Sequence, residues 1–399
     1  MLLTMKEVNR LRVVQGYLDG QIDIEEASRI LKRHPRSVYR VVAKVRAKGP
    51  EGVLHGNRNK VSCRRVPEFT RKKIIEMTLG KYRDINDTHL CEILKEAEGI
   101  RIGRETLREI LRKEGIPSKR KVKRRKYRRR RERKEAFGMM LQIDASPHDW
   151  LECRGPWLTL VGSIDDATGH VWGHFEEAET TWSYLDLMEE IFHTQGLPLS
   201  LYADRHSIFY TSREPTIIEQ LKDVVPLTQF GRAMEELGIS LIKAWSPQAK
   251  GRVERLWGTL QDRLVVTLRL AGANTLEQAR EVLKRFLKEY NRRFCLLPKQ
   301  SVAVFKKAPP AVVLHKILCL KETRVVKKDH TVSFEGLVLQ IPPSKTYPCI
   351  ADRKVDVREY RDGHIEIVYR DTVVARFSSE AIRRLLNSKS VQHHMKMAA

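Results

Sequence analysis

The sequence predicts a multidomain protein with an all-helical N-terminal region, a central α/β domain with one mixed sheet, and a small C-terminal β domain. Three observations predict this arrangement. Apolar residues recur at helical spacing through the first 116 residues, strand-like apolar runs alternate with helices from about residue 137, and short alternating strands follow residue 320. A chain of 399 residues, 41% of them hydrophobic, is long enough for two to four domains with ordinary cores.

The net charge indicates what kind of partner the protein binds. The chain carries a formal net charge of +25. A cation of this size needs a polyanion as its partner, and nucleic acid is the usual one. A ribosome-associated protein or a membrane-surface protein would be the alternative. The charge therefore predicts a nucleic-acid-binding protein.

The six cysteines predict neither a zinc site nor a disulfide framework. None belongs to a Cys-x-x-Cys pair and no Cys/His cluster has zinc spacing, so we expect buried thiols in a reducing compartment. The sequence shows no secretory signal pattern, and no apolar run approaches the roughly 18 residues of a membrane span. These features predict a soluble, cytoplasmic protein.

Residues 1–60 are expected to form a helix-turn-helix domain. Two helically spaced apolar sets lie on either side of a short joint, and Pro35 suits the first turn of the second helix. A small helical packing domain with a solvated face is the alternative. In the DNA-binding interpretation, the second helix presents its polar face to the major groove through Arg36, Ser37, Arg40 and Lys44.

Residues 66–118 repeat this pattern and predict a second helix-turn-helix domain. One helix is expected from about Asp87 to Glu98 and another from about Arg104 to Glu114. Glycines follow both helices, at the positions where helix C-caps favour glycine. Arg104 and Arg108 are the candidate DNA contacts of this domain.

Residues 119–136 are expected to form a basic arm. Nearly every position from 119 to 134 is Lys or Arg, and such a block repels itself unless phosphates neutralise it. A solvated linker is the alternative. We expect the arm to follow the DNA backbone without reading sequence, through Arg128, Arg129, Arg130 and Arg131.

Residues 137–295 are expected to form the α/β domain. MMLQIDAS, WLTLVGSIDD and HVWGHFEEA read as three strands, and TTWSYLDLMEEIFHTQG reads as a helix that ends at Gly196. LPLSLYAD and ISLIKAW read as two further strands, and helices follow. This order predicts one mixed five-stranded sheet covered by helices.

Residues 320–380 are expected to form a small β-barrel. TVSFEGLVLQI, KVDVREYRDGHIEIVYR and TVVARF show the alternation of half-buried strands. Asp362-Gly363 is a strong signal for a hairpin turn between two of them.

Three carboxylates stand out in the α/β domain. Asp144 and Asp204 each follow an apolar strand, where a lone carboxylate is costly unless it binds a cation. Glu254 lies near the start of a basic helix, at the edge of its apolar stripe, with Lys250 one turn earlier. That stripe is expected to pack on the sheet and includes Val253, Leu256, Trp257, Leu260 and Leu264.

Carboxylate clusters in a DNA-binding protein point to a divalent metal site. Mg²⁺ prefers oxygen ligands, and two such ions about 3.5–4 Å apart can hold the attacking and leaving oxygens of a phosphoryl transfer. The nucleophile would be water or a DNA 3′-hydroxyl, so the chemistry needs no Ser, Cys or His nucleophile.

Asp144, Asp204 and Glu254 resemble the DDE triad of the retroviral-integrase superfamily, which has an RNase H-like core. SPQAKGRVERLWGTLQDRL, which contains Glu254, is similar to the signature helix of bacterial insertion-sequence transposases. DASPHDWLECRGPWLTLVGSIDDATG, DRHSIF, TQFGRAMEELGI and EYNRRF resemble the ISNCY-type transposases in particular. The chain departs from many relatives in two ways: Arg205-His206 replaces Asn-Gly after the second acid, and 49 residues separate Asp204 from Glu254.

The resemblance implies an enzyme that cuts DNA at the ends of its mobile element and joins the freed 3′-hydroxyls to target DNA. It implies that Asp144, Asp204 and Glu254 bind two Mg²⁺ ions, for which Mn²⁺ substitutes. Phosphate near the site would be contacted by Lys250, Arg252 and Arg255. The helix-turn-helix domains would bind terminal inverted repeats, and the enzyme would act as a homo-oligomer, at least a dimer, that holds two DNA ends.

Several alternatives stay open from the sequence. Asp144 could cap a turn, Asp204 could pair with an arginine, and Glu254 could pair with a cation on its own helix. The adjacent Asp165 and Asp166 are better explained by a β-turn than as ligands. A DNA-binding regulator with an inactive core, or an RNase H-like nuclease or resolvase, would be the alternative function.

Overall fold

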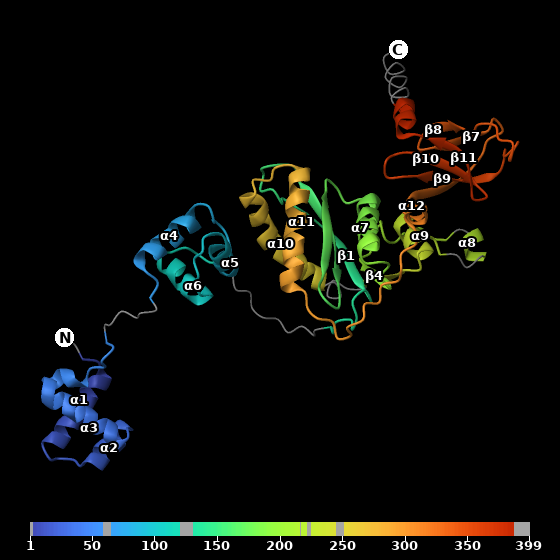
Figure 1. Ribbon diagram of the computed structural model, residues 1–399. Helices are drawn as coiled ribbons and strands as arrows, with labels where there is room; N and C mark the ends of the chain where they lie inside the picture. Colours follow the sequence, from blue (N-terminus) through green and yellow to red (C-terminus); the bar gives the residue numbers. More distant parts are fainter. Residues whose placement is uncertain are drawn as a thin grey trace. The chain divides into compact units, whose positions relative to one another are not determined.

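The structure is a computed structural model that describes residues 3–58, 65–119, 131–215, 217–221, 225–244 and 251–386 (Figure 1). The chain divides into two compact units. One contains the first four α-helices and residues 110–115, and the other contains residues 84–109 and the chain from residue 116 onward. No described helix is long and apolar enough to cross a membrane.

The N-terminal helices confirm the first predicted helix pair. Helices α1 (Met5–Leu18), α2 (Ile24–Leu31) and α3 (Pro35–Lys48) are followed by a short 3₁₀ helix, η1 (Gly49–Val53). The carboxylate of Asp23 caps α2 by accepting a hydrogen bond from Glu26 N at 2.7 Å, and Pro35 occupies the first turn of α3 as expected. The common core consists of Val14, Ala27, Val38, Val42, Val45 and Val53.

Three helices follow, of which the second and third match their predicted ranges. They are α4 (Glu68–Leu79), α5 (Asp87–Ala97) and α6 (Arg104–Lys113). Asn86 caps α5 by accepting a hydrogen bond from His89 N at 2.9 Å. Gly99 and Gly115 have φ values of +67° and +73°, which explains why glycine follows each helix.

The central sheet has five strands, as predicted. They are β1 (Leu141–His148), β2 (Leu158–Asp165), β3 (Val171–Glu176), β4 (Ser200–Ala203) and β5 (Ser240–Lys243), in the order β3-β2-β1-β4-β5. Strands β1, β2 and β3 pair antiparallel, whereas β4 pairs parallel to both β1 and β5. The carboxyl ends of β1, β3 and β4 therefore lie at one edge of the sheet.

Helices cover both faces of this sheet (Figure 1). One face packs against α7 (Thr181–Thr194) and α9 (Gln229–Glu236), around buried residues such as Ile143, Tyr184 and Phe230. The other packs against α10 (Gly251–Leu270) and α11 (Leu276–Phe294). A short helix, α8 (Ile217–Leu221), lies between β4 and α9 in the chain. The apolar stripe predicted for α10 is buried in this second core.

The C-terminal region has a different architecture from the one predicted. After α12 (Ala311–Ile317), β6 (Leu320–Val325), β9 (Lys354–Glu359), β10 (Ile365–Tyr369) and β11 (Thr372–Phe377) form an antiparallel sheet in the order β11-β10-β9-β6. Strands β7 (Thr331–Phe334) and β8 (Leu337–Gln340) form a separate hairpin on the same core. The strands described here do not close into one barrel, because β6 and β11 remain the edges of the larger sheet.

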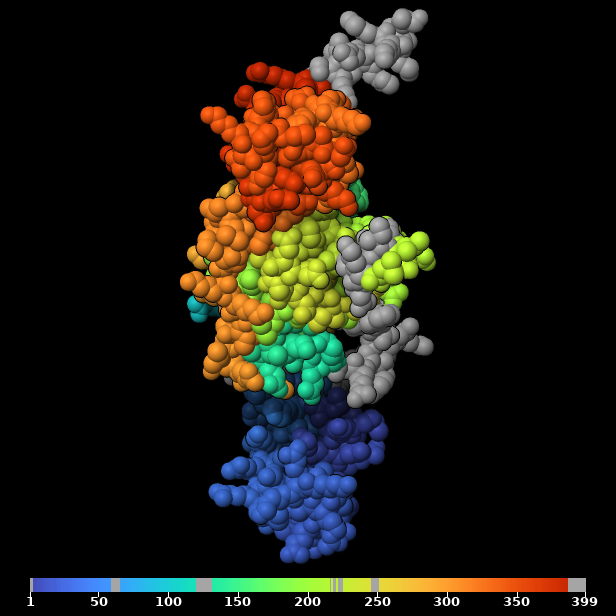
Figure 2. Space-filling model, turned by 90° about the vertical axis from the view of Figure 1, so that its right-hand side faces the viewer, coloured from blue at the N-terminus to red at the C-terminus, as the bar shows by residue number. Residues whose placement is uncertain are grey.

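The turn predicted between β9 and β10 is present, and Gly363 has a φ of +82°. Strand β6 also contacts the central domain. The side-chain amide of Gln229 in α9 exchanges two hydrogen bonds with the backbone of Lys321, at 2.7 and 3.0 Å. In Figure 2 the yellow-green α9 region accordingly lies beside the orange-red C-terminal sheet.

Candidate active site

The two aspartates lie on neighbouring parallel strands. Leu141 and Gln142 of β1 pair with Leu201 and Tyr202 of β4. Continuing that register by two residues sets Asp144 beside Asp204, which directly follows β4. Both aspartates are half-buried. The sheet thus brings together two acids that are 60 positions apart in the sequence.

Local contacts orient each aspartate. Oδ2 of Asp144 accepts a hydrogen bond from the indole Nε1 of Trp257 at 3.0 Å. Oδ1 of Asp204 accepts one from His206 N at 3.0 Å, which forms a tight turn after β4. Trp257 is only 8% exposed, so its predicted place in the core is confirmed, and its N–H faces the candidate site.

Glu254 lies in the first turn of α10 and is exposed. It precedes Trp257 by three residues, so both project from the same side of the helix. Because Trp257 contacts Asp144, the turn of α10 that carries Glu254 lies next to the strand that carries Asp144. Among the described residues, no three His, Cys, Asp or Glu side chains are already gathered closely enough to hold a metal ion.

A fourth carboxylate, which was not predicted from the sequence, lies at this edge of the sheet. Glu179 lies in the connection from β3 to α7, and its Oε1 accepts a hydrogen bond from the hydroxyl of Tyr184 at 2.7 Å. Tyr184 is fully buried. Burial is the largest cause of the raised pKa of the Tyr184 phenol, and the negative charges of Glu179, Asp144 and Asp204 raise that pKa further. Glu179, Asp144 and Asp204 therefore all lie close enough to Tyr184 to act on its hydroxyl.

Arg252 does not occupy the position predicted for a phosphate contact. Its guanidinium is buried, with Nε 2.6 Å from Oδ1 of Asp166. Arg131 donates to the same oxygen, and Lys134 N donates to Oδ2 at 2.8 Å. The expectation of DNA contact is therefore wrong for Arg252, whose guanidinium is buried. The physical reason is the buried carboxylate of Asp166, which needs cationic partners. Arg131 binds the same carboxylate but is itself exposed, so its predicted DNA contact stays a prediction.

The interpretation of Asp165 as a turn residue is confirmed, whereas the Asp166 carboxylate pairs with Arg252 and Arg131. Oδ1 of Asp165 accepts hydrogen bonds from Thr168 N and Thr168 Oγ1 at 2.7 and 2.8 Å, and Oδ2 accepts one from Gly138 N at 3.0 Å. Burial raises the pKa of the Asp165 carboxyl, while these hydrogen bonds lower it. Asp165 thus closes the turn after β2.

The candidate DNA contacts of α3 have the exposure that their proposed role requires. Arg36, Arg40 and Lys44 are exposed and Ser37 is half-buried, on the side of α3 away from its buried valines. Arg255 of α10 is also exposed, although its Nε donates to Gly251 O at 2.6 Å. Other predicted contacts lie outside the described residues, namely Arg128, Arg129, Arg130 and Lys250.

The candidate contacts of α6 are already paired. Arg104 lies 2.9 Å from Glu105, and Arg108 contacts Glu105 at 3.1 Å and Asp87 at 3.5 Å. All these arginine side chains are exposed, so phosphate could compete for them. The acids nevertheless reduce the positive potential of this face.

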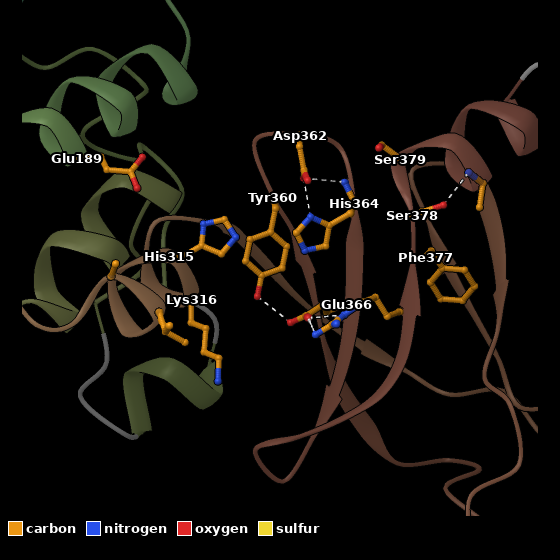
Figure 3. A pocket seen from close by; sticks show the side chains of 14 residues that line it. Glu189, His315, Lys316, Tyr360, Asp362, His364, Glu366, Phe377, Ser378 and Ser379 are labelled. Carbon is orange, nitrogen blue, oxygen red and sulfur yellow. Dashed lines mark hydrogen bonds and ion pairs between the residues drawn. The ribbon is translucent and has the colours of Figure 1, made fainter.

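A groove of about 1010 Å³ lies between α12 and the C-terminal sheet (Figure 3). Three of its rings form a stack, in which the Tyr360 ring centroid lies 4.6 Å from that of His315 and 4.1 Å from that of His364. Glu366 and Arg376 also line it and pair with each other. None of the three candidate acids lines this groove, so it is separate from the candidate active site.

Helix pairs ahead of an α/β core with carboxylates at its parallel strand ends are the arrangement expected of one class of protein, enzymes that act on DNA. Comparison with known proteins agrees with this class. Residues 9–60 match a family described as a helix-turn-helix domain. The protein y4bF of Sinorhizobium fredii, classed among transposases, is 32% identical over 369 residues, which cover 92% of this chain and 79% of that protein. The transposase for insertion sequence IS1202 of Streptococcus pneumoniae is 32% identical over 368 residues, which cover 83% of this chain and 77% of that protein.

The chain therefore belongs to the insertion-sequence transposases. Solved structures are also similar. The catalytic core domain of HTLV-2 integrase in complex with magnesium is 17% identical, covers 37% of this chain and 82% of its own, and has a TM-score of 0.29. A simian T-cell lymphotropic virus intasome in complex with a PP2A regulatory subunit is 14% identical, covers 77% and 96%, and has a TM-score of 0.35.

Proposed function

We propose that this transposase uses Asp144, Asp204 and Glu254 as a catalytic triad to cut the ends of its insertion sequence and to join them to target DNA. The observation that carries the proposal is the β1–β4 register, which sets Asp144 beside Asp204. The Trp257–Asp144 hydrogen bond supports it further, because it attaches the helix that carries Glu254 to the first aspartate.

The three carboxylates would hold two Mg²⁺ ions, for which Mn²⁺ substitutes. The donor set fits these cations, because all three side chains offer oxygen. When bound, such ions stabilise the attacking and leaving oxygens of an in-line displacement. Within the chain, the Trp257 indole orients the Asp144 carboxylate, and Arg255 is available to contact a DNA phosphate.

Both proposed reactions are phosphoryl transfers. In cleavage, a water oxygen bonds to phosphorus and the P–O3′ bond breaks, so the element end leaves as a 3′-hydroxyl after taking up a proton. In strand transfer, that 3′-oxygen loses its proton and bonds to a target phosphorus, and the target's own 3′-oxygen leaves. Cleavage removes one phosphodiester bond, whereas strand transfer leaves the number of phosphodiester bonds unchanged.

We propose that the N-terminal domains bind the terminal inverted repeats. Exposed Arg36, Arg40 and Lys44 on α3 support base or phosphate contacts there. The basic arm would follow the backbone through residues 128–130. The working enzyme would be at least a dimer that holds two DNA ends, at the bacterial nucleoid. We also assign the chain to the ISNCY-type transposases, on the motifs described above.

The proposed domains keep the boundaries expected from the sequence. They are two helix-turn-helix domains (1–60 and 66–118), an arm (119–136), a catalytic core (137–295) and a small β domain (320–380). The start of strand β1 at Leu141 and the end of helix α11 at Phe294 support the bounds of the core.

The test is DNA cleavage and joining by the purified full chain. The protein would be incubated with Mg²⁺ and labelled duplexes from the DNA that flanks its own gene. We expect nicks at the 3′ ends of inverted repeats, joining to a second duplex, and loss of both in Glu254→Gln. Glu281→Gln is a matched control, because Glu281 is an exposed glutamate of α11.

The outcomes separate the alternatives. Tight binding to the repeats without cutting, by the parent and the variant alike, would indicate a DNA-binding regulator. Cutting of RNA–DNA hybrids without joining would indicate an RNase H-like nuclease. Equal cleavage by the parent and Glu254→Gln would remove Glu254 from the triad.

A further inference from the structure

Strand β1 and helix α10 are joined by three evenly spaced polar contacts. Val253 N donates to Oε1 of Gln142 at 3.4 Å, Trp257 Nε1 donates to Oδ2 of Asp144 at 3.0 Å, and Gln261 Nε2 donates to Oγ of Ser146 at 3.2 Å. The strand residues are two positions apart and the helix residues are four apart. We call these three contacts the polar ladder.

The spacing of the polar ladder follows from backbone geometry. Two residues of a strand advance about 6.6–6.8 Å, and four residues of an α-helix advance about 6.0 Å. Alternate strand residues point to one face of the sheet, and every fourth helix residue points to one face of the helix. A run of three contacts can therefore form only when α10 lies along β1 in one register.

The apolar contacts of α10 fix that register less strictly. Val253, Leu256 and Leu260 are buried against the sheet, and burial of apolar surface has no directional requirement. Hydrogen bonds need their atoms within about 3.5 Å and well aligned. A shift of one residue along the helix moves each donor by about 1.5 Å and turns it by about 100°, which breaks all three contacts.

A glycine leaves room for the indole that makes the middle contact of the polar ladder. Gly162 of β2 pairs with Asp144 across the sheet. A Cβ atom added at Gly162 would lie 2.7 Å from Cη2 of Trp257, closer than two carbon atoms can approach. The indole ring therefore lies directly over Gly162, and its N–H can reach Asp144 only because no side chain is present there.

We propose that the polar ladder is a positioning device, which sets the register of α10 on β1 and so places Glu254 relative to Asp144. Glu254 lies between the first two contacts, directly after Val253 and three residues before Trp257. Trp257 is the central positioning residue, because the carboxylate that it orients is itself a proposed metal ligand. The catalytic consequence rests on the proposed function, whereas the register itself does not.

The first test measures the register without metal or DNA. Hydrogen exchange of the full-length protein would be followed in α10 for the parent, for Trp257→Phe and for Gln261→Met. Both variants lose the N–H donor; Gln261→Met nearly keeps the volume of the side chain, whereas Trp257→Phe also leaves a cavity in the core. We expect amide exchange over residues 253–261 to rise at least tenfold in Trp257→Phe and less in Gln261→Met. The cavity should lower the urea midpoint of Trp257→Phe, whereas Gln261→Met should keep the parent midpoint, so a rise in exchange in Gln261→Met reports the register alone. Trp157→Phe is the matched control, since Trp157 is 66% exposed and should change nothing.

The second test measures Mn²⁺ binding by the electron paramagnetic resonance of free Mn²⁺. Trp257→Phe and Gly162→Ala should each weaken binding about tenfold, and Trp157→Phe should not. Unchanged exchange and unchanged Mn²⁺ affinity in Trp257→Phe would overturn the proposal. If the parent protein binds no Mn²⁺, the proposed metal site fails, and the exchange experiment alone then decides on the ladder. If Trp257→Phe does not fold, Gln261→Met decides: unchanged exchange in that variant counts against the ladder.

Discussion

The Arg252 guanidinium lies inside the central domain, with its Nε 2.6 Å from Oδ1 of Asp166. Asp166 also accepts a hydrogen bond from the side-chain amide of Gln142 at 2.9 Å. The Asp166 carboxylate, in the turn after β2, thus contacts both Gln142, which makes the first contact of the polar ladder, and Arg252 at the start of α10.

Removal of either partner of this buried pair should destabilise the central domain. Arg252→Met leaves the Asp166 carboxylate with less charge compensation, and the loss of one partner of a buried pair costs about 3–5 kcal/mol. Urea unfolding of the full chain would measure it. Arg292→Met is the control, because Arg292 and its partner Glu289 are 77% and 54% exposed, and little change is expected. Equal midpoints for both variants would show that the buried pair does not stabilise the fold.

Replacement of Arg128, Arg129 and Arg130 by glutamine should weaken DNA binding on every sequence. Each phosphate contact that is lost makes the slope of log K against log salt shallower by about 0.9, so three losses predict a change of roughly two to three. Fluorescence anisotropy at several salt concentrations would measure it, with repeat and non-repeat duplexes of equal length. Arg131→Gln should change the slope by less than one such contact, because the Asp166 carboxylate competes with phosphate for this exposed guanidinium. A loss confined to the repeat duplex would mean that the arm reads sequence.

Glu179→Gln should weaken Mn²⁺ binding without abolishing it. Glu179 adds negative charge near the two aspartates but is held by Tyr184, so we expect a loss of roughly three- to tenfold. Asp204→Asn should lose binding altogether, since that variant removes a proposed ligand. Calorimetric titration with Mn²⁺ would compare the two. Complete loss in Glu179→Gln would make Glu179 a ligand, and no change would place it outside the field of the site.

Acid should destabilise the central domain partly through His170. Burial lowers the pKa of this imidazole below its ordinary value near 6.5. Between the lowered pKa and about 6.5, the unfolded chain binds the proton and the folded chain does not. The free energy of unfolding therefore falls as the pH is lowered through that window. His170→Phe keeps the ring beside Trp172, whose centroid lies 4.3 Å away, and should show a shallower pH dependence.

The matched control for this prediction is Trp157→Phe, an aromatic substitution at a 66% exposed position that removes no titratable group. Its pH dependence of unfolding should follow that of the parent protein. A His170→Phe curve parallel to the parent curve would exclude His170 as a source of the acid sensitivity.

The helices and the individual strands of the central domain were predictable because they depend on local patterns. Apolar spacing located α3, α5 and α10, and glycines such as Gly99 marked helix ends. Asp144 and Asp204 could be singled out because each carboxylate follows an apolar run. Their placement side by side depends on the long-range pairing of β1 with β4, which the local pattern does not determine.

Long-range pairing could not be predicted in the same way. Nothing local to Arg252 distinguishes an arginine that binds Asp166, 86 positions earlier, from one that binds phosphate. In the sequence, nothing distinguishes Tyr184, which donates a hydrogen bond to Glu179, from the other core residues of α7. Closure of the C-terminal strands into a barrel depends on which edges pair, and alternation along a strand carries no information about its edges.

The close contact between Gly162 and the Trp257 ring also bears on how copies of such an element lose activity through mutation. Under the proposed mechanism, a copy that retains Asp144, Asp204 and Glu254 would still encode a weakened enzyme if the codon for Gly162 has changed, because a side chain at that position displaces the indole. Inspection of the acids alone would then count decayed copies as active. We expect position 162 to separate mobile copies from silent ones, and a transposition assay on Gly162→Ala would show whether it does.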